Sequence, residues 1–155
     1  MVKKVKKKEM FLNYMRIAIE VAKKHKCEEI PVGCVIVNDE TGKILAKSCN
    51  KTKKLCNPLM HAEIICINKA LKKINKDRLS DCSMYVTMEP CGMCVGAIAL
   101  AKIKKLYIGC LNQKTGATIS NRCQFDIHNH KPQIFYPVME EECGKIVLDF
   151  FKKKR

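Results

Sequence analysis

The pair Cys91 and Cys94, in the sequence Pro-Cys-Gly-Met-Cys, is the residue pattern of this chain with the clearest chemical meaning. Two thiolates one helical turn apart can bind one tetrahedral metal ion. A position at the start of a helix adds the positive end of the helix dipole, which favours the thiolate form. The same spacing also occurs in redox pairs and in half of a structural zinc site, so a catalytic metal requires a third ligand.

His61 and Glu63, in the sequence His-Ala-Glu, supply that ligand and an acid beside it. The imidazole of His61 is a suitable metal ligand, and the carboxylate of Glu63 can move protons between water and a substrate. On its own, the triplet would indicate only an exposed helix start at which Glu63 complements the dipole. Followed by the cysteine pair, it resembles the H-x-E and P-C-x-x-C signature of zinc-dependent nucleobase deaminases.

The zinc site predicted from these residues is open to water. Three protein ligands leave the fourth position for a water molecule, whose pKa the metal lowers toward neutrality. Glu63 can take a proton from water, deliver it to a ring nitrogen and then protonate the departing ammonia. A structural site would need a fourth protein ligand instead, for which His128 and His130 are candidates in a loop without clear pattern. The chemistry favours a catalytic site with Glu63 as the proton carrier.

These residues must be positioned by helices and strands that the hydrophobic pattern indicates. Asn57 is expected to cap the helix that carries His61, with Pro58 as its first residue. The residues from 118 to 131 are expected to form a loop with short helical turns. The predicted strands are 31–37, 43–48, 83–88 and 103–110, and the predicted helices are 9–25, 57–73, 91–101 and 140–152. An antiparallel hairpin followed by right-handed parallel crossovers predicts a mixed sheet with helices on both faces.

Length and composition predict one domain over residues 1–155, with residues 1–8 as a flexible basic N-terminus. The chain begins with lysines rather than an apolar signal, and no later apolar stretch is long enough to cross a bilayer. We therefore expect a cytoplasmic protein without a membrane partner. The 11 cysteines are an odd number, which favours reduced thiols, and Cys34, Cys49, Cys66 and Cys110 lie in apolar runs where cysteine acts as a small hydrophobe.

The formal net charge of +15 favours a polyanionic partner, because lysines near phosphates release condensed counterions. Charge alone does not identify the nucleic acid. The alternative is that scattered lysines only keep the protein soluble. An anionic membrane surface is less favoured, since the lysines do not lie on one face of an amphipathic helix.

From about Met15 to its C-terminus, the chain resembles the tRNA adenosine deaminases of the cytidine-deaminase-like superfamily. The motifs that carry this resemblance are E-I-P-V-G at 29–33, Asn50 after the second strand, H-A-E-I at 61–64, Y-V-T-M-E-P-C-G-M-C at 85–94 and K-T-G-A at 114–117. The resemblance implies a three-layer α/β/α fold with a central mixed five-stranded sheet. It also implies one Zn²⁺ per subunit, a homodimer, and conversion of the anticodon wobble adenosine of tRNA to inosine.

The same resemblance implies roles for five further residues. Asn50 would hydrogen-bond the flipped nucleoside, Val32 would form a wall for the base, and Glu29 would contact the bound nucleotide or its loop. Asn112 and Lys114 would contact the anticodon loop. Each has a plain structural alternative: a turn cap for Asn50, core for Val32, solvent for Glu29, and an ordinary polar turn for Asn112 and Lys114.

Two segments qualify the resemblance. The stretch 109–114, G-C-L-N-Q-K, departs from the common bacterial pattern and is similar to the catalytic subunit of the eukaryotic heterodimeric enzyme, so a heterodimer stays an alternative. The end of the chain, 149–155, combines aromatic and basic residues that could approach RNA; otherwise Phe150 and Phe151 are core residues ahead of a solvated tail. The competing functions are a deaminase of a free nucleobase or nucleoside, of the guanine or cytosine type, and a non-catalytic zinc-containing RNA-binding subunit. The intact Glu63 argues against the latter.

Overall fold

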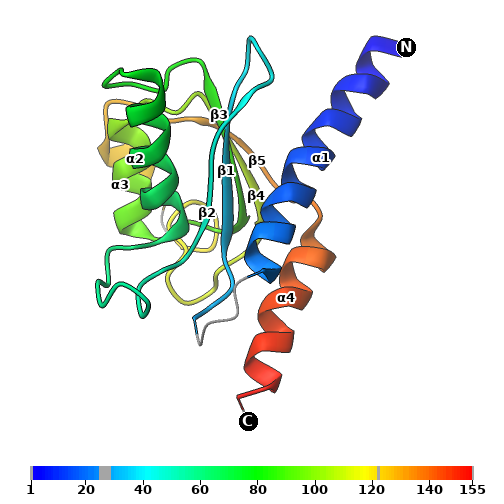
Figure 1. Ribbon diagram of the computed structural model, residues 1–155, viewed down its shortest axis with the longest axis vertical. Coiled ribbons are helices and arrows are strands. Elements are labelled where there is room, and N and C mark those ends of the chain that lie inside the picture. Colours follow the sequence, from blue (N-terminus) through cyan, green and yellow to red (C-terminus); the bar gives the residue numbers. More distant parts are fainter. Residues whose placement is uncertain (1, 25–28, 122, 155) are drawn as a thin grey trace.

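The computed structural model describes residues 2–24, 29–121 and 123–154, with side chains from Glu9 onward. It contains a five-stranded sheet and four α-helices (Figure 1). In chain order the elements are α1 (Val2–Lys23), β1 (Gly33–Asn38), β2 (Ile44–Cys49), α2 (Ala62–Ile74), β3 (Cys82–Met88), α3 (Gly92–Leu100), β4 (Lys105–Cys110), a short 3₁₀ helix (Gln124–Ile127), β5 (Gln133–Phe135) and α4 (Glu140–Lys152). The fold class predicted from the sequence is confirmed.

The sheet is mixed, and its strand order is β2-β1-β3-β4-β5. Strand β1 pairs antiparallel with both β2 and β3, whereas β3, β4 and β5 run parallel. Because β3 and β4 run parallel, their carboxyl ends lie at the same end of the sheet. The N-terminus of α3, which follows β3, lies beside them. This end is where the cysteine pair lies.

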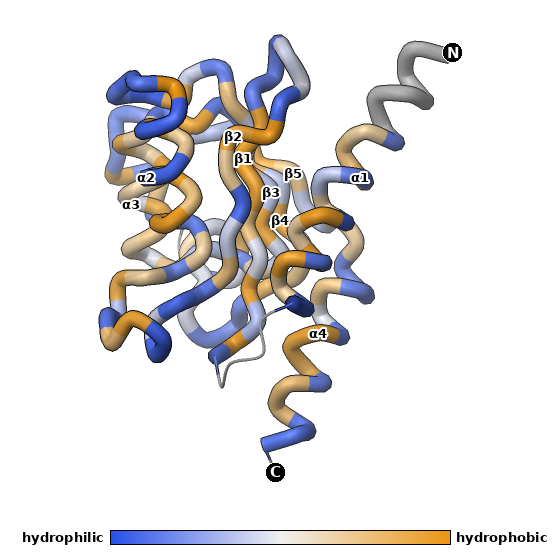
Figure 2. Tube along the Cα trace, in the orientation of Figure 1, coloured by the Kyte–Doolittle hydropathy of each residue, from blue (hydrophilic) through white to orange (hydrophobic). Residues whose placement is uncertain are grey.

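Helices cover both faces of the sheet, as the sequence predicts. Figure 1 shows α2 and α3 together on one face and α1 and α4 on the other. The α2 and α3 face encloses an aliphatic core that includes Ile36, Val86, Ile98 and Ile108. In Figure 2 the hydrophobic residues are concentrated in the strands between these two helical layers. Burial of these apolar surfaces is the main favourable term that holds the layers together.

The α1 and α4 face is packed by aromatic rings rather than by aliphatic chains. Tyr107 stacks between Tyr85 and Phe135, with ring centroids 4.4 Å and 4.5 Å apart, and Phe11 of α1 covers Tyr107 at 5.2 Å. Helix α1 lies so close to β1 that a Cβ on Gly33 would come within 1.9 Å of the carbonyl oxygen of Ala18. A side chain at position 33 would therefore force the first helix away from the sheet.

Two predicted helix starts are wrong, and one strand was not predicted. Helix α1 begins at Val2 rather than Glu9, since lysine and valine do not interrupt a helix and the segment has no proline or glycine. The predicted end of this helix at His25 lies outside the described residues. Helix α2 begins at Ala62, because the side chain of Asn57 accepts a hydrogen bond from the Leu59 N–H and forms a turn instead of a helix cap. Strand β5 was not located from the sequence pattern. Within the described parts of the chain, none of the helices combines the length and apolar character that a membrane crossing requires.

Candidate active site

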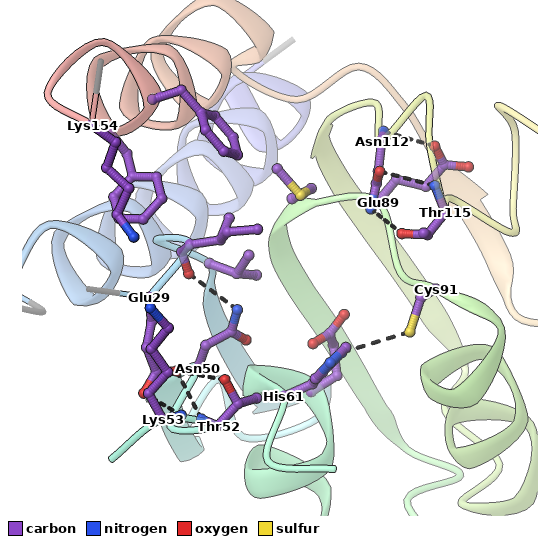
Figure 3. Close-up of a pocket in the computed structure, with 16 residues that line it drawn as sticks. Glu29, Asn50, Thr52, Lys53, His61, Glu89, Cys91, Asn112, Thr115 and Lys154 are labelled. Carbon is purple, nitrogen blue, oxygen red and sulfur yellow. Dashed lines mark hydrogen bonds between the residues drawn. The ribbon is translucent and has the colours of Figure 1, made fainter. Parts of the chain in front are cut away.

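A cavity of about 370 Å³ opens at the edge of the sheet where β3 ends and α2 and α3 begin. Its size lies in the usual range for small-molecule sites. Figure 3 shows its wall, to which the segment before β1, the loops after β2 and β4, and α4 also contribute. The lining residues are Glu29, Ile30, Val32, Asn50, Thr52, Lys53, His61, Glu63, Met88, Glu89, Cys91, Asn112, Thr115, Phe150, Phe151 and Lys154. Segments far apart in the sequence therefore meet in one site.

The three predicted metal ligands converge at this cavity. His61 precedes the first residue of α2 and Cys91 precedes the first residue of α3, and their side chains point toward one another in Figure 3. The Nδ1 atom of His61 lies 3.6 Å from the Sγ atom of Cys91 and 3.5 Å from that of Cys94. Tetrahedral zinc with bonds of about 2.0 Å to nitrogen and 2.3 Å to sulfur separates such atoms by about 3.5 Å. The set therefore fits one zinc ion, with Nδ1 of His61 as its nitrogen ligand.

The two thiols differ in proton affinity. The pKa of Cys91 is lowered to about 4, because Cys94 donates a hydrogen bond to it and His61 adds a second hydrogen bond and a positive charge. The pKa of the buried Cys94 is raised, since the neighbouring Cys91 thiolate accepts its hydrogen bond and burial disfavours a second charge. A divalent cation at the centre of the set would replace the shared proton. This donor chemistry supports the fit to zinc.

Glu63 is the acidic group at the deep wall of the cavity. It lies in the first turn of α2, two residues after His61, and only 4% of its surface is exposed. Burial raises the pKa of its carboxyl to about 7, and this effect outweighs the opposing influence of its own backbone N–H and of His61. A carboxyl with a pKa near neutrality can both accept and donate a proton during one reaction. Glu63 therefore has the properties of a general acid and base.

Asn50 fixes the start of the helix that carries His61 and Glu63. Its Oδ1 atom accepts a hydrogen bond of 2.9 Å from the Ala62 N–H, and its Nδ2 atom donates to the carbonyl oxygen of Ile30 at 3.1 Å. The first N–H groups of a helix have no partner inside the helix, so this contact satisfies one of them from outside. Asn50 also lines the cavity. The predicted substrate contact and the turn-fixing alternative are therefore compatible, because each amide atom can form a second hydrogen bond.

Glu29 is buried, and it holds the loop after β2 in place. Its carboxylate accepts hydrogen bonds from the backbone N–H groups of Thr52, Lys53 and Lys54, at 2.7 Å, 3.1 Å and 3.0 Å. The Thr52 hydroxyl donates a further bond at 3.2 Å. The solvated role that was the alternative for Glu29 is thus wrong. Glu29 lines the cavity, and its main contacts there are with the protein itself.

Glu89, directly before Pro90 and Cys91, anchors the loop after β4. Its two oxygens accept six hydrogen bonds, from the backbone N–H groups of Asn112, Thr118, Ile119 and Ser120 and from the hydroxyls of Thr118 and Ser120. Burial alone would raise the pKa of this carboxyl, but the hydrogen bonds from Ser120, Ile119 and Asn112 outweigh it and lower the pKa to about 2. Glu89 is therefore a permanent anion.

Gly116 shows how tightly this loop closes over Glu89. A Cβ on Gly116 would lie 2.2 Å from the Oε2 atom of Glu89, and the residue pairs with Cys91 in an isolated β-bridge. Only glycine permits this approach between the loop and the metal-binding turn.

The other predicted site residues divide into two groups. Val32 and Asn112 line the cavity, whereas Lys114 is exposed and lies outside the lining. The side chain of Asn112 exchanges hydrogen bonds with Thr115, so it also stabilises its own turn (Figure 3). His128 and His130 are not part of the metal-binding group. The Nε2 atom of His130 instead contacts the carbonyl oxygen of Ile103 at 2.6 Å.

The final turn of α4 forms the rim of the cavity. Phe150 and Phe151 line it with their rings edge to face, 5.3 Å between centroids, and the Lys154 ammonium lies 4.8 Å from the centre of the Phe150 ring. Phe151 is 47% exposed. An aromatic and cationic rim of this kind can stack on a base and contact a phosphate.

Comparison with known proteins agrees with this geometry. The family model of the cytidine and deoxycytidylate deaminase zinc-binding region matches residues 8–110. The tRNA-specific adenosine deaminase of Rickettsia bellii is 44% identical over 129 residues, which are 82% of this chain and 89% of that protein. The enzyme of the same name from Bacillus subtilis is 37% identical over 92% of this chain and 89% of its own length. This chain belongs to the tRNA-specific adenosine deaminase family.

Solved structures extend the comparison to the fold of this family member. One structure, from a study of A-to-I editing by tRNA:A34 deaminases at the wobble position of transfer RNA, has a TM-score of 0.83 and 35% identity, and it covers 86% of this chain and 98% of its own. The guanine deaminase from Nitrosomonas europaea has a TM-score of 0.77 at 14% identity, over 90% of this chain and 83% of that one. The second likeness concerns the fold alone.

Sequence reasoning missed several residues that shape the site of this deaminase. Glu89, Met88 and Thr115 lie within motifs given above but had no role assigned to them, and Thr52 and Lys53 were not considered. The position of Glu89 was the available signal. A carboxylate between the end of a strand and the Pro-Cys start of a helix is expected to be buried beside the metal, and a buried carboxylate needs partners. The remaining four have no signal in the sequence that separates them from ordinary loop residues.

Proposed function

We propose that this chain converts the wobble adenosine of tRNA anticodons to inosine by zinc-dependent hydrolysis, in which water replaces the amino group and ammonia leaves. His61, Cys91 and Cys94 hold the single zinc ion, and Glu63 carries the protons. The observation that carries the proposal is a buried carboxyl beside a His-Cys-Cys set, in a cavity of nucleoside size. Bound zinc supplies a coordinated water of near-neutral pKa.

The residues of the cavity divide the remaining tasks. Glu63 accepts a proton from water and passes it to a ring nitrogen of adenine. It then takes the second proton of that water from the newly attached hydroxyl group and supplies it to the departing amino group, which leaves as ammonia. Glu29 and Glu89 do not compete for these protons, because backbone N–H groups occupy their oxygens. Val32 and Met88 provide apolar contact for the base, and Asn50 holds the turn that aims Glu63.

An RNA substrate is supported by the open rim of the cavity and by the relatives. A base in a structured loop must be extruded before its ring can reach the site. The exposed Phe151 and the Lys154 ammonium at the rim suit a nucleotide that stays attached to a polyanion. The proteins of 37–44% identity described above carry the name tRNA-specific adenosine deaminase. A cytoplasmic location follows from this substrate and stays a prediction.

The decisive experiment offers competing substrates to the purified protein. An anticodon stem-loop RNA with adenosine at the wobble position is incubated in parallel with free adenosine, cytidine and guanine, and the products are analysed for inosine and other deaminated bases. Inosine in the RNA alone is the expected result. Product from a free base or nucleoside would show that the chain is a small-molecule deaminase. No product in any reaction would indicate a missing subunit or a binding role.

We further propose that the protein forms a homodimer through α3. This nine-residue helix has no charged side chain, and Leu100 at its end is 77% exposed. Ile127, the last residue of the 3₁₀ helix that packs against α3, is 75% exposed. Exposed apolar surface of this kind marks association sites. Sedimentation should give a mass of two chains, and Leu100→Lys should shift it to one. A monomeric wild-type protein would favour the heterodimeric alternative.

A further inference from the structure

A hollow lined by five lysines lies beside the active-site cavity, on the other side of the loop that follows β2. Its volume is about 310 Å³, and it is formed by the C-terminal end of α1, the edge strand β2, the following loop and α2. The lysines are Lys24, Lys47, Lys51, Lys54 and Lys69. The other lining residues are Val21, Ser48 and Cys49, so among the described residues no acidic side chain contributes. We call this surface the lysine hollow.

Among the described residues, no ion pair neutralises the charges of the lysine hollow. Within the described parts of the chain, the ion pairs of lysine and arginine lie elsewhere, such as that of Lys105 with Asp39. The Lys69 ammonium donates instead to the carbonyl oxygen of Lys47 at 3.5 Å. Ammonium groups gathered in a concave surface repel one another, and the field they produce attracts counter-ions. A polyanion is the ligand that such a surface binds most favourably.

One short loop joins the lysine hollow to the active site. Thr52 and Lys53 line the active-site cavity, whereas Lys51 and Lys54 line the lysine hollow. The buried carboxylate of Glu29 holds this loop through the N–H groups of Thr52, Lys53 and Lys54. The distance between the two surfaces is therefore set by the fold.

We propose that the lysine hollow binds backbone phosphates of the RNA strand on one side of the nucleotide that enters the active site. The proposal rests on the proposed function, because it takes the cavity occupant to be a nucleotide within an RNA. A strand that leaves the cavity over the loop 51–54 would bring its next phosphates to Lys51, Lys54, Lys47 and Lys69. Phosphate contacts of this kind position a nucleic acid without reading its sequence.

The competing explanation is that the lysines protect an edge strand. Strand β2 has a free edge in the sheet order, and lysine on an edge strand discourages pairing with another chain. That explanation predicts self-association when the lysines are removed, and no change in RNA binding. A phosphate-binding surface predicts the reverse, so the two can be separated by one set of variants.

The test compares two triple variants of equal charge. The first is Lys47→Gln, Lys54→Gln and Lys69→Gln, three exposed residues of the lysine hollow; Lys53, in the active-site lining, is unchanged. The control is Lys72→Gln, Lys76→Gln and Lys104→Gln, three exposed residues outside both linings. Fluorescence anisotropy measures Kd for an RNA hairpin with wobble adenosine at several salt concentrations. Thermal unfolding and sedimentation confirm that each variant folds and does not aggregate.

The first variant should bind the hairpin about tenfold more weakly or worse at ~0.1 M salt, with a salt slope smaller by about 2, since each phosphate contact contributes about 0.7. The control variant should bind nearly as the wild type, and kcat at saturating RNA should be unchanged in both. Equal losses in the two variants would show a diffuse charge effect and overturn the proposal. Unchanged RNA binding with new self-association would assign the lysines to edge protection and overturn the proposal. Binding to vesicles containing phosphatidylserine is measured in parallel. A loss confined to vesicle binding would assign the lysines to a membrane and would also overturn the proposal. The binding assay does not depend on turnover, so absence of inosine would indicate a missing subunit or a binding role for this chain without deciding the present proposal.

Discussion

Two buried carboxylates of the active-site cavity, Glu63 and Glu89, differ in the charge that the fold gives them. Their exposed fractions are similar, 4% and 2%. The pKa of Glu63 is raised to about 7, whereas that of Glu89 is lowered to about 2. Burial disfavours the anion at both positions, and it is the main cause of the raised pKa of Glu63. At Glu89, hydrogen bonds from Ser120, Ile119 and Asn112 outweigh the effect of burial.

This difference separates the chemistry of the site from its scaffold. Six hydrogen bonds hold Glu89 as an anion, and through them it fixes the loop 112–120 against the metal-binding turn. Glu63 faces the cavity and keeps a proton affinity suited to catalysis near neutral pH. Glu63 therefore transfers protons, and Glu89 stabilises the loop that forms one wall of the cavity. Changes at the two positions should therefore fail in different ways.

Loss of a metal ligand should have the largest effect, because it lowers zinc binding, catalytic activity and the stability of the fold together. In Cys94→Ala, and equally in Cys91→Ala, we expect zinc content well below one per chain, no detectable inosine and a lower melting temperature, since metal binding is coupled to folding. Elemental analysis, product analysis and calorimetry measure the three quantities. Full zinc occupancy in either variant would contradict the ligand assignment.

Replacement of Glu63 should remove catalysis without disturbing the scaffold. Glu63→Gln preserves the shape of the side chain and cannot carry the proton, so kcat should fall by about 10²- to 10⁴-fold or further. Glu63→Ala should behave in the same way. Zinc content and melting temperature should stay close to those of the wild type in both variants. A loss of zinc in Glu63→Gln would mean that the carboxylate acts on the metal rather than on the protons.

Replacement of Glu89 should show the opposite pattern. Glu89→Gln puts an NH₂ group among N–H donors and removes charge-assisted hydrogen bonds, which should lower the free energy of unfolding by about 3 kcal/mol. Catalysis should decline less than in Glu63→Gln, because the proton carrier and the metal ligands remain. Urea denaturation monitored by circular dichroism measures the first effect, and single-turnover inosine formation measures the second. A stable, inactive Glu89→Gln variant would place this residue in the chemistry and break the comparison.

The parts of the fold that sequence reasoning located are those with local signals. The closing helix was predicted at its observed bounds, Glu140–Lys152, because its apolar positions recur at helical spacing. Strand β5 was missed because it has only three residues, Gln133–Phe135, and is too short to show a period. The start of α2 was misplaced because Asn57 and Pro58 suit a turn as well as a helix cap, and only the tertiary structure decides between them.

The same distinction applies to the site. The zinc ligands could be recognised because metal chemistry constrains their type and spacing in the sequence. The anchoring roles of Glu29 and Glu89 could not, because their hydrogen-bond partners lie from 23 to 31 residues away along the chain and consist mostly of backbone N–H groups. Backbone donors have no residue type by which a sequence could reveal them.

Asn50 offers the smallest and sharpest test of the division between scaffold and chemistry, because it contacts the turn that carries Glu63. Asn50→Ala removes the acceptor for the Ala62 N–H and should cost about 1 kcal/mol of unfolding free energy, as does loss of a helix cap. Asn50→Asp keeps that acceptor but loses the hydrogen bond to the Ile30 carbonyl oxygen, so it should recover only part of the stability. If Asn50 also binds the nucleoside, kcat/KM should fall in both variants, because aspartate cannot donate a hydrogen bond through its carboxylate. If Asn50 only fixes the turn, kcat/KM should recover together with stability in Asn50→Asp. Steady-state kinetics on the stem-loop RNA, measured beside the melting temperatures, would distinguish the two.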